Sequence, residues 1–313
     1  MKLDERALGI ACIVGAMFSF TTQDALIKWL SGGYPLHEIV FVRAVLAAGL
    51  TLFMMQIEGG MILLRSSRPG LHIGRGLLLV LANSSFFMAL AAMPIGEASA
   101  MFFVAPLMIT VLSAVVLEET VGVRRWLGVI VGLAGVIVMF RPGAEVVRLV
   151  ALLPVVAAAA YSSMQIMTRK LGVTDRASTM AFYVQLTFIF VGLAMGLVAG
   201  DGRFAPTDNP SLEFLLRAWR WPQPTDAILF MGIGVLSAAG AYLMSQAYRV
   251  CAAALVAPFE YVALPLAVMW GLVLWGEWPD ATAMLGIALI LGGGLYVLHR
   301  ELLARAAGRA KAG

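Results

Sequence analysis

Residues 119–135 read ETVGVRRWLGVIVGLAG, and residues 277–293 read EWPDATAMLGIALILGG. An offset of 158 residues aligns one glutamate and two glycines of each stretch: Glu119 with Glu277, Gly128 with Gly286, and Gly135 with Gly293. Pro106 falls one residue from register with Pro265, and Phe102 aligns with Glu260. Apolar, glycine-rich segments can resemble each other by chance, but polar and glycine positions that coincide in order favour an internal repeat.

The composition indicates that much of the surface faces lipid. Hydrophobic residues make up 61% of the 313 residues, charged residues only 13%, and the mean hydropathy is +0.91. A soluble domain has roughly 25% charged residues, so this chain has too few to cover a water-exposed surface. Its net charge of +4 is not gathered in one patch, which argues against nucleic-acid binding. The two cysteines, Cys12 and Cys251, fall in or beside apolar segments and predict no disulfide framework.

Ten apolar windows divide the chain, and nearly all of them are long enough to cross a bilayer, with the fifth marginal. They cover residues 8–28, 37–57, 73–93, 97–117, 126–141, 149–169, 178–199, 227–248, 252–275 and 281–299. Inside lipid the backbone must satisfy its own hydrogen bonds, so each window is expected to be a helix.

The repeat then predicts an all-α membrane protein with ten transmembrane helices arranged as two inverted five-helix repeats. The first repeat is expected over residues 1–142 and the second over 149–300, followed by a cytoplasmic basic tail over 301–313. Each half holds five helices, an odd number, so the halves insert in opposite directions, as in many transporters.

Lysine and arginine residues predict the orientation. With a cytoplasmic N-terminus, only six of the 22 lie in outer segments: Lys28, Arg141, Arg148, Arg203, Arg217 and Arg220. Arg43 lies within a helix, and the other fifteen lie inside. This bias predicts a multi-pass protein of the inner (plasma) membrane with both termini cytoplasmic.

Four stretches together resemble the drug/metabolite transporter superfamily, and specifically its ten-helix EamA-type members. They are LEETVGVRRWLGVIVGLAGVIV (117–138), LWGEWPDATAMLGIALILGGGLYV (274–297), DALIKWLSGGYPLHEIVFVRA (24–44) and APFEYVALPLAVMWG (257–271). The last two are loosely similar to a subgroup that includes riboflavin and S-adenosylmethionine importers. The resemblance implies a central cavity between two five-helix halves and no ATP-hydrolysing domain. In agreement, the sequence contains no GxxxxGK[ST] loop.

Charged residues within spans are costly and are therefore functional candidates. Arg43 lies about six residues into the second window, which is roughly 9 Å below the outer boundary. Asp24 is expected at nearly the same depth on the first helix, so it could pair with Arg43, or with Lys28 one turn away. These three residues either staple two helices together or serve in gating or substrate binding, and we assign Arg43 with Asp24 to the outer gate.

Glu260 is the most central acid, about eight residues into the ninth window. Pro258 and Pro265 flank it, and a kink there would leave a free carbonyl near the carboxylate. Glu260 is thus a candidate for proton coupling or substrate contact, and the alternative is a structural partner for a neighbouring helix.

Other polar and aromatic residues within spans either hold helices together or line a cavity. The site residues predicted beside Glu260 are Gln23, Asn83, Phe102, Tyr161, Gln165, Gln246 and Tyr261. In this arrangement one half contributes an aromatic wall and the other an acid.

The function that follows is secondary active transport of a small organic metabolite by alternating access, with no cofactor and no bound metal. Import of a riboflavin-like or S-adenosylmethionine-like solute with proton coupling is the first hypothesis, and export of amino acids, drugs or other metabolites is the alternative.

An intramembrane enzyme is disfavoured because His37, His72 and His299 all lie at helix ends or in loops. A channel is disfavoured because no filter-like loop appears. The partners are the bilayer and a small-molecule substrate, and the protein is expected to be a monomer or a homodimer.

The long connection between the seventh and eighth windows contains an amphipathic pattern. Leu212, Leu215, Leu216 and Trp219 follow Pro210 at helical spacing, which predicts a surface helix over residues 211–219 at the membrane interface. The alternative is an ordinary loop segment that caps the outer mouth.

Overall fold

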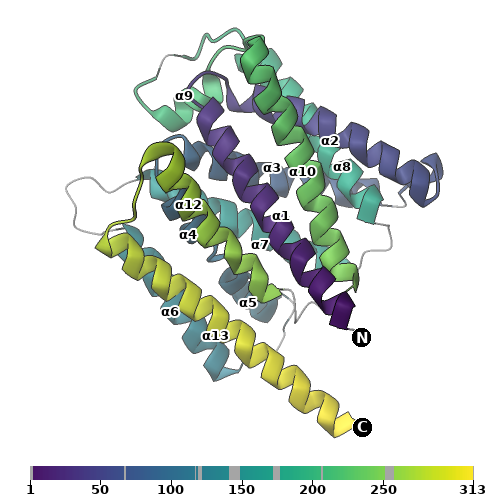
Figure 1. Cartoon of the computed structure of the whole chain (residues 1–313), viewed down its shortest axis with the longest axis vertical. Coiled ribbons are helices and arrows are strands. Elements are labelled where there is room, and N and C mark those ends of the chain that lie inside the picture. Colours follow the sequence, from purple (N-terminus) through teal and green to yellow (C-terminus); the bar gives the residue numbers. More distant parts are fainter. Residues whose placement is uncertain are drawn as a thin grey trace.

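The computed structural model describes residues 3–66, 68–116, 118, 122–140, 149–171, 177–205, 207–250 and 257–312, and all regular structure in this part of the chain is helical. The α-helices are α1 (Leu3–Leu30), α2 (Leu36–Glu58), α3 (Pro69–Leu90), α4 (Ile95–Phe102), α5 (Ala105–Val116), α6 (Val123–Phe140), α7 (Leu152–Leu171), α8 (Ala177–Ala199), α9 (Pro210–Leu216), α10 (Pro224–Val250), α12 (Ala263–Trp275) and α13 (Ala281–Ala312). Three short 3₁₀ segments join them: η1 (Met61–Leu64), η2 (Leu149–Ala151) and η3 (Ala257–Val262). The long helices form one bundle, and the two termini lie at the same end of it (Figure 1).

Seven helices in the described part of the chain are long and apolar enough to cross a membrane. They coincide with α1, α2, α3, α4 joined to α5, α7, α8 and α10. Three shorter apolar helices cover Trp126–Phe140, Phe259–Trp275 and Ala281–Val297. The structure therefore confirms the predicted all-helical class. The ten-span inverted repeat stays a prediction.

Two spans are interrupted, and both interruptions place a proline in the first turn of the helix that follows. Helix α4 ends at Phe102 and α5 begins at Ala105, directly before Pro106. The 3₁₀ segment η3 likewise gives way to α12 at Ala263, two residues before Pro265. A proline in a first turn removes no intrahelical bond, so the helix can restart there. The kink expected near Glu260 is thus a 3₁₀ segment that contains this residue.

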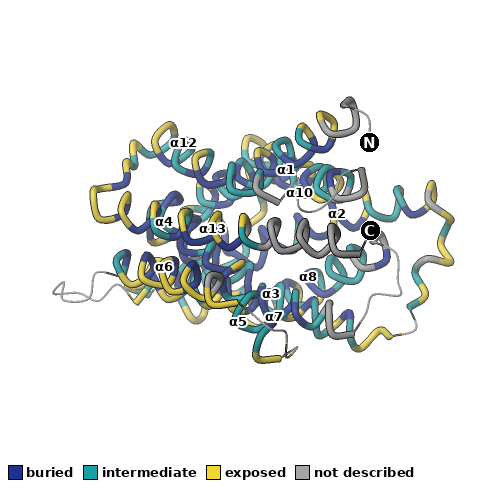
Figure 2. The backbone as a smooth tube through the Cα atoms, turned by 90° about the horizontal axis from the view of Figure 1, so that it is seen from below, coloured by how far each residue is buried: buried dark blue, intermediate teal, exposed yellow. Residues whose placement is uncertain are grey.

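Helices from the two ends of the sequence pack side by side. Helix α1 runs along α10 and α3 runs along α7, while α2 contacts α8 and α6 contacts α13. Seen from below, the buried positions gather between the helices and the exposed positions lie mostly on the outside (Figure 2). Many exposed positions are large apolar side chains, such as Ile57, Phe190 and Leu197, which suits a lipid environment.

Glycines let α6 and α13 approach closely. A Cβ atom added at Gly293 would come within 2.6 Å of the Gly128 carbonyl oxygen, and one added at Gly135 within 2.8 Å of the Gly286 carbonyl oxygen. Side chains larger than hydrogen would push the two helices apart, so these glycines set the helix separation, as small residues do in membrane helix pairs.

The helix predicted in the long connection is confirmed in part. Helix α9 covers Pro210–Leu216, and the Asn209 side chain caps it by accepting hydrogen bonds from Ser211 and Leu212. The prediction was wrong over 217–219, which lie beyond the end of α9; Leu212 is 42% exposed, as a side chain facing lipid would be, whereas Phe214 is 1% exposed. Phe214 is buried because α9 docks on α2 and α3, where the Ser211 hydroxyl donates to the Met88 carbonyl at 2.7 Å. Helix α9 therefore covers one end of the bundle.

The glycine contact gives a matched test. Gly293→Ala should lower the unfolding temperature of the purified protein, because its new Cβ would meet the Gly128 carbonyl and overpacking costs about 1–3 kcal/mol. Gly292→Ala should be neutral or stabilising, because nothing lies within 4 Å of a Cβ at that position. Thermal unfolding monitored by tryptophan fluorescence measures both, and equal behaviour of the two variants would contradict the close α6–α13 contact.

Candidate functional site

Aromatic side chains from several helices meet around Tyr161 in the interior of the bundle. The Phe102 ring at the end of α4 lies 5.6 Å from the Tyr161 ring on α7 and 5.3 Å from the Phe86 ring on α3. Gln165, one turn after Tyr161, donates a hydrogen bond from Nε2 to the tyrosine hydroxyl at 2.9 Å. The hydroxyl is therefore oriented by an amide, and its own proton remains available to an acceptor.

The second half of the chain adds an acid to this wall. Glu260 lies on η3 and is close enough to Tyr161 and Tyr261 to interact electrostatically with both. The Tyr261 ring lies 5.3 Å from the Phe103 ring, which joins the end of α4 to the same region. We call Phe86, Phe102, Tyr161, Gln165, Glu260 and Tyr261 the central cluster. Five of these six residues were predicted from the sequence, and Phe86 was not.

A buried cation lies on α2 beside the aromatic wall. Arg43 is 4% exposed, and its guanidinium carbon lies 5.0 Å from the centre of the Phe188 ring and 5.5 Å from that of Phe87. Asp24 on α1 interacts electrostatically with it, but no ion pair within 4.0 Å joins the two among the described residues, so the predicted pairing stays a prediction. The Nε atom of Arg43 is buried without a hydrogen-bond partner among the described residues. Arg43 thus keeps a donor that the folded chain does not use.

Lys28 has a different partner from the one considered in the sequence. Its ammonium group contacts both Glu277 carboxylate oxygens, at 2.6 and 2.8 Å, and donates to the Met93 carbonyl at 3.1 Å. It also lies 4.7 Å from the centre of the Trp275 ring. Pairing of Lys28 with Asp24 was therefore wrong, because a carboxylate 249 residues away in sequence approaches more closely.

Glu277 also binds the backbone of the first half. Its Oε2 accepts a hydrogen bond from the Ile95 amide, the first residue of α4, at 3.3 Å. The preceding residue, Pro94, provides no side-chain cap for this helix. The Lys28–Glu277 bridge therefore ties together α1, the α3–α4 turn and the connection from α12 to α13. The sequence repeat aligns Glu277 with Glu119, but it does not indicate that Glu277 pairs with Lys28.

The other predicted polar residues are less connected. Gln23 is 5% exposed, and its Oε1 atom lacks a partner in the described part of the chain. Asn83 on α3 and Gln246 on α10 are half-buried. In the described part of the chain no hydrogen bond joins these two side chains to the central cluster, so their role stays a prediction.

Hydrogen bonds concentrate at the bundle end that carries α9. The Tyr34 hydroxyl donates to Asp226 at 2.7 Å, and the Arg217 guanidinium donates to the Ser31 carbonyl at 2.8 Å. Buried Glu38 accepts from the Arg220 amide at 3.0 Å. Together with the Lys28–Glu277 bridge, these contacts close this end of the bundle.

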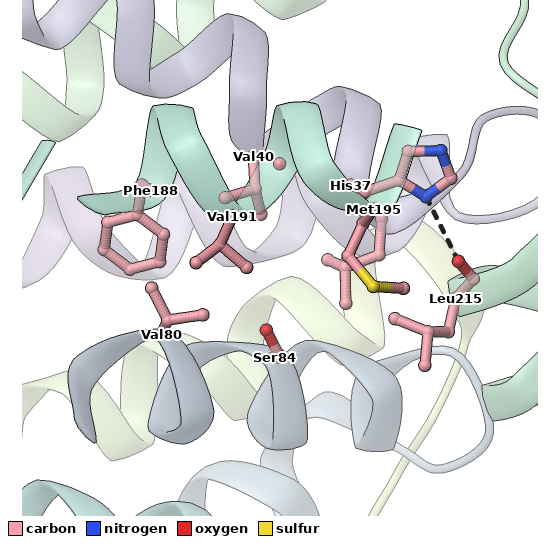
Figure 3. Close-up of a pocket in the computed structure, with 10 residues that line it drawn as sticks. His37, Val40, Val80, Ser84, Phe188, Val191, Met195 and Leu215 are labelled. Carbon is pink, nitrogen blue, oxygen red and sulfur yellow. Dashed lines mark hydrogen bonds between the residues drawn. The ribbon is translucent and has the colours of Figure 1, made fainter. Parts of the chain in front are cut away.

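A small pocket lies beneath this cap, between α2, α3, α8 and α9 (Figure 3). Its volume is about 30 Å³, enough for one or two water molecules. Figure 3 shows Phe188 and Val80 at one end and His37 at the other, with the His37 Nδ1 atom 3.1 Å from the Leu215 carbonyl. Since a carbonyl only accepts, Nδ1 carries the hydrogen. The pocket is too small for a metabolite, but its Phe188 wall is one of the rings that hold Arg43.

Comparison with known proteins finds a matching transporter family and relatives that are named as transporters. Residues 7–141 match the EamA-like transporter family. A riboflavin transporter of Vibrio cholerae is 29% identical over 88% of this chain and 87% of its own length. An S-adenosylmethionine uptake transporter of Rickettsia prowazekii is 23% identical over 94% and 93% of the two chains.

Two further matches extend the comparison. A pseudopaline exporter of Pseudomonas aeruginosa is 28% identical over 93% of this chain and 96% of its own length. A solved crystal structure with 19% sequence identity aligns with a TM-score of 0.61 over 98% of this chain and 99% of its own, which shows a shared fold. These matches confirm the resemblance to EamA-type members of the drug/metabolite transporter superfamily.

The Lys28–Glu277 bridge yields a stability prediction. Lys28→Met leaves a mostly buried carboxylate without its cation, and we expect a loss of at least about 2 kcal/mol. Asp201→Asn is the control, since the Asp201–Arg203 pair is more than half exposed and should contribute less than about 1 kcal/mol. Thermal unfolding in detergent measures both. Exchange of the two charges in the Lys28→Glu/Glu277→Lys double variant should recover part of the loss, and no recovery would argue against a direct pair.

Proposed function

We propose, on the premise that this chain is an EamA-type member of the drug/metabolite transporter superfamily, that it is a secondary active transporter of a small organic metabolite working by alternating access. The observation that carries the proposal is the central cluster, in which an acid from the second half of the chain lies beside aromatic rings that come from both halves. Apolar walls with a few convergent polar groups are typical of sites for ring-containing solutes. Relatives named as transporters align with the chain over most of its length.

We propose that the seven long and three shorter apolar helices are ten spans in two inverted five-helix repeats, over residues 1–142 and 149–300. The spacing of helix starts supports this. Helices α5 and α12 begin at Ala105 and Ala263, and α6 and α13 begin at Val123 and Ala281, so both pairs have the 158-residue offset of the sequence repeat.

The packing supports the same symmetry. Exchange of the halves converts the α1–α10 pair into α7–α3, and it maps α2–α8 and α6–α13 onto themselves. The contact of Gly128 with Gly293 likewise becomes that of Gly286 with Gly135. Reciprocal contacts of this kind are what a pseudo-two-fold axis produces.

The orientation follows from the bias of lysine and arginine toward the segments on the side of the termini. Both termini are then cytoplasmic, and the end closed by α9 and the Lys28–Glu277 bridge faces outside. In this arrangement Lys28 belongs to the outer gate, and Asp24 and Arg43 lie one to two turns beneath it.

For the substrate we propose uptake of a ring-containing metabolite, with Glu260 as the proton or substrate contact. The relative named for S-adenosylmethionine uptake supports this direction, and the relative named as a riboflavin transporter supports a ring-containing solute. Export is the second candidate, supported by the relative named as a pseudopaline exporter.

Transport into liposomes tests the function. Purified protein should take up labelled riboflavin or S-adenosylmethionine, and a screen of metabolites retained by cells with and without the protein widens the search. Accumulation of no solute, in either direction and with or without a proton gradient, would overturn the proposal.

Glu260→Gln should lower the transport rate by about tenfold or more and flatten its pH dependence, because it keeps size and hydrogen bonding but cannot titrate. Asp201→Asn, at an exposed position, is the control that should leave both properties unchanged. A Glu260→Gln protein that inserts normally and transports with unaltered rate and pH profile would rule out coupling through this acid.

The topology can be checked by cysteine labelling in a background without Cys12 and Cys251. Cysteines at Arg125 and Arg305 should react with a membrane-impermeant maleimide only in inverted vesicles, whereas one at Phe204 should react in intact cells, because the lysine and arginine bias places these segments on opposite sides. Labelling of Arg125→Cys or Arg305→Cys in intact cells would place these segments outside and contradict the proposed orientation.

A further inference from the structure

Glu260 lies on a segment whose own hydrogen bonds fix its shape only weakly. The 3₁₀ segment η3 covers six residues, and Pro258 within it has no amide hydrogen. A 3₁₀ helix has poorer hydrogen-bond geometry than an α-helix, and runs of more than about four residues are uncommon. The direction of the Glu260 side chain therefore depends on the contacts that the neighbouring side chains of η3 make.

The residues on either side of Glu260 are both anchored. Phe259 packs against a small hydrophobic core between α1, α10 and α12 that includes Ile13. The Tyr261 ring lies 5.3 Å from the Phe103 ring. Successive side chains on a 3₁₀ helix point about 120° apart, because the helix has three residues per turn. Two anchored directions leave one for Glu260, so its orientation follows from its neighbours.

A glycine on α13 completes the seat of Tyr261. A Cβ atom added at Gly294 would overlap the Tyr261 hydroxyl oxygen and would come within 2.9 Å of its Cζ atom. The hydroxyl end of the ring therefore lies directly against the backbone of α13, which a side chain at this buried position would prevent. We call Gly294 and Phe103 the tyrosine socket.

The sequence repeat shows that the socket belongs to the half that carries the acid. At the offset of 158 residues Tyr261 aligns with Phe103, and Gly294 aligns with Val136. The ring with a hydroxyl thus occurs together with a residue that has no side chain, whereas the ring without a hydroxyl occurs together with valine. The first half also has no acid at the position equivalent to Glu260. Space for a hydroxyl is therefore provided only beside the acid.

We propose that Tyr261 is a positioning residue for Glu260, and that Gly294 and Phe103, by holding its ring, set the direction in which the carboxylate points. This inference deepens the proposed transport function and rests on it for the role of Glu260. A misplacement of about 1 Å can slow a reaction about a hundredfold, so the socket would control the transport rate without contacting the solute.

Three consecutive glycines on α13 provide a matched set of variants. A Cβ atom added at Gly292 would meet nothing within 4 Å. One added at Gly293 would meet the backbone of α6, and one added at Gly294 would meet Tyr261. Gly294→Ala should lower the initial rate of uptake of labelled riboflavin or S-adenosylmethionine into liposomes at least about tenfold. Gly292→Ala should leave the rate unchanged, and Gly293→Ala should lower the unfolding temperature without a comparable loss of rate per folded molecule.

Two variant backgrounds separate positioning from packing. In a Glu260→Gln protein, Gly294→Ala should lower the rate further by about twofold or less, because residues that act through each other have non-additive effects. Tyr261→Phe removes the hydroxyl that the new Cβ would meet, so in that background the effect of Gly294→Ala should shrink to about threefold or less. Where Gly294→Ala does not fold, Phe103→Leu loosens the other wall of the socket and should show the same dependence on Glu260.

A measurement that needs no transport follows the carboxylate itself. Dicyclohexylcarbodiimide modifies protonated carboxylic acids in apolar surroundings, and mass spectrometry of the peptide that contains Glu260 gives the rate of modification. Gly294→Ala should change this rate at least about threefold, because the protonation of a buried acid depends on its surroundings. Gly292→Ala is the control and should leave the rate as it is in the unmodified protein.

The inference is overturned if Gly294→Ala slows transport as much in the Glu260→Gln background as in the unmodified protein. It is also overturned if Gly294→Ala leaves the modification rate of Glu260 unchanged. Absence of transport by the unmodified protein would remove the proposed function alone, because carbodiimide modification still reports on the position of Glu260.

Discussion

A backbone in lipid has no water to accept its hydrogen bonds, and the architecture of this chain follows from that constraint. Each apolar segment closes its own bonds as a helix, and irregular backbone is tolerated only where protein surrounds it. The two interrupted spans obey this rule. The break between α4 and α5 and the 3₁₀ segment η3 both lie inside the bundle, and they carry Phe102, Phe103, Glu260 and Tyr261. Places where helices break are also where a membrane protein can offer polar groups to a solute.

The same low-dielectric interior makes each buried charge costly, and the chain shows two ways of stabilising one. Near the closed end, Lys28 is neutralised by direct contact with Glu277 and by a carbonyl. Deeper, Arg43 is held by aromatic rings and by the more distant charge of Asp24. A fully satisfied pair stabilises one arrangement of helices, whereas an incompletely satisfied one retains capacity to bind.

The helical fold was predictable because hydropathy alone specifies which segments enter lipid. The partner of Lys28 was not, because sequence spacing suggests pairs only within one helix or between neighbouring windows, and Glu277 reaches it from the far end of the chain. The end of α9 was misplaced for a related reason. Helical periodicity extends to residue 219, but α9 ends at Leu216, and its docking on α2 and α3 buries Phe214, which the periodicity did not single out. In contrast, the central cluster was largely predicted, because repeat alignment brought Phe102 and Glu260 into correspondence.

One residue links the closed end to the site. Glu277 contacts Lys28 on α1 and also accepts from the Ile95 amide at the start of α4. Helix α4 is only eight residues long, and Phe102 ends it against Tyr161. Separation of Glu277 from this end would uncap α4 and release α1 in the same event. Under the proposed function, this short helix would give alternating access a direct mechanical path, because opening the end that holds the Lys28–Glu277 bridge and reshaping the central cluster would both move α4.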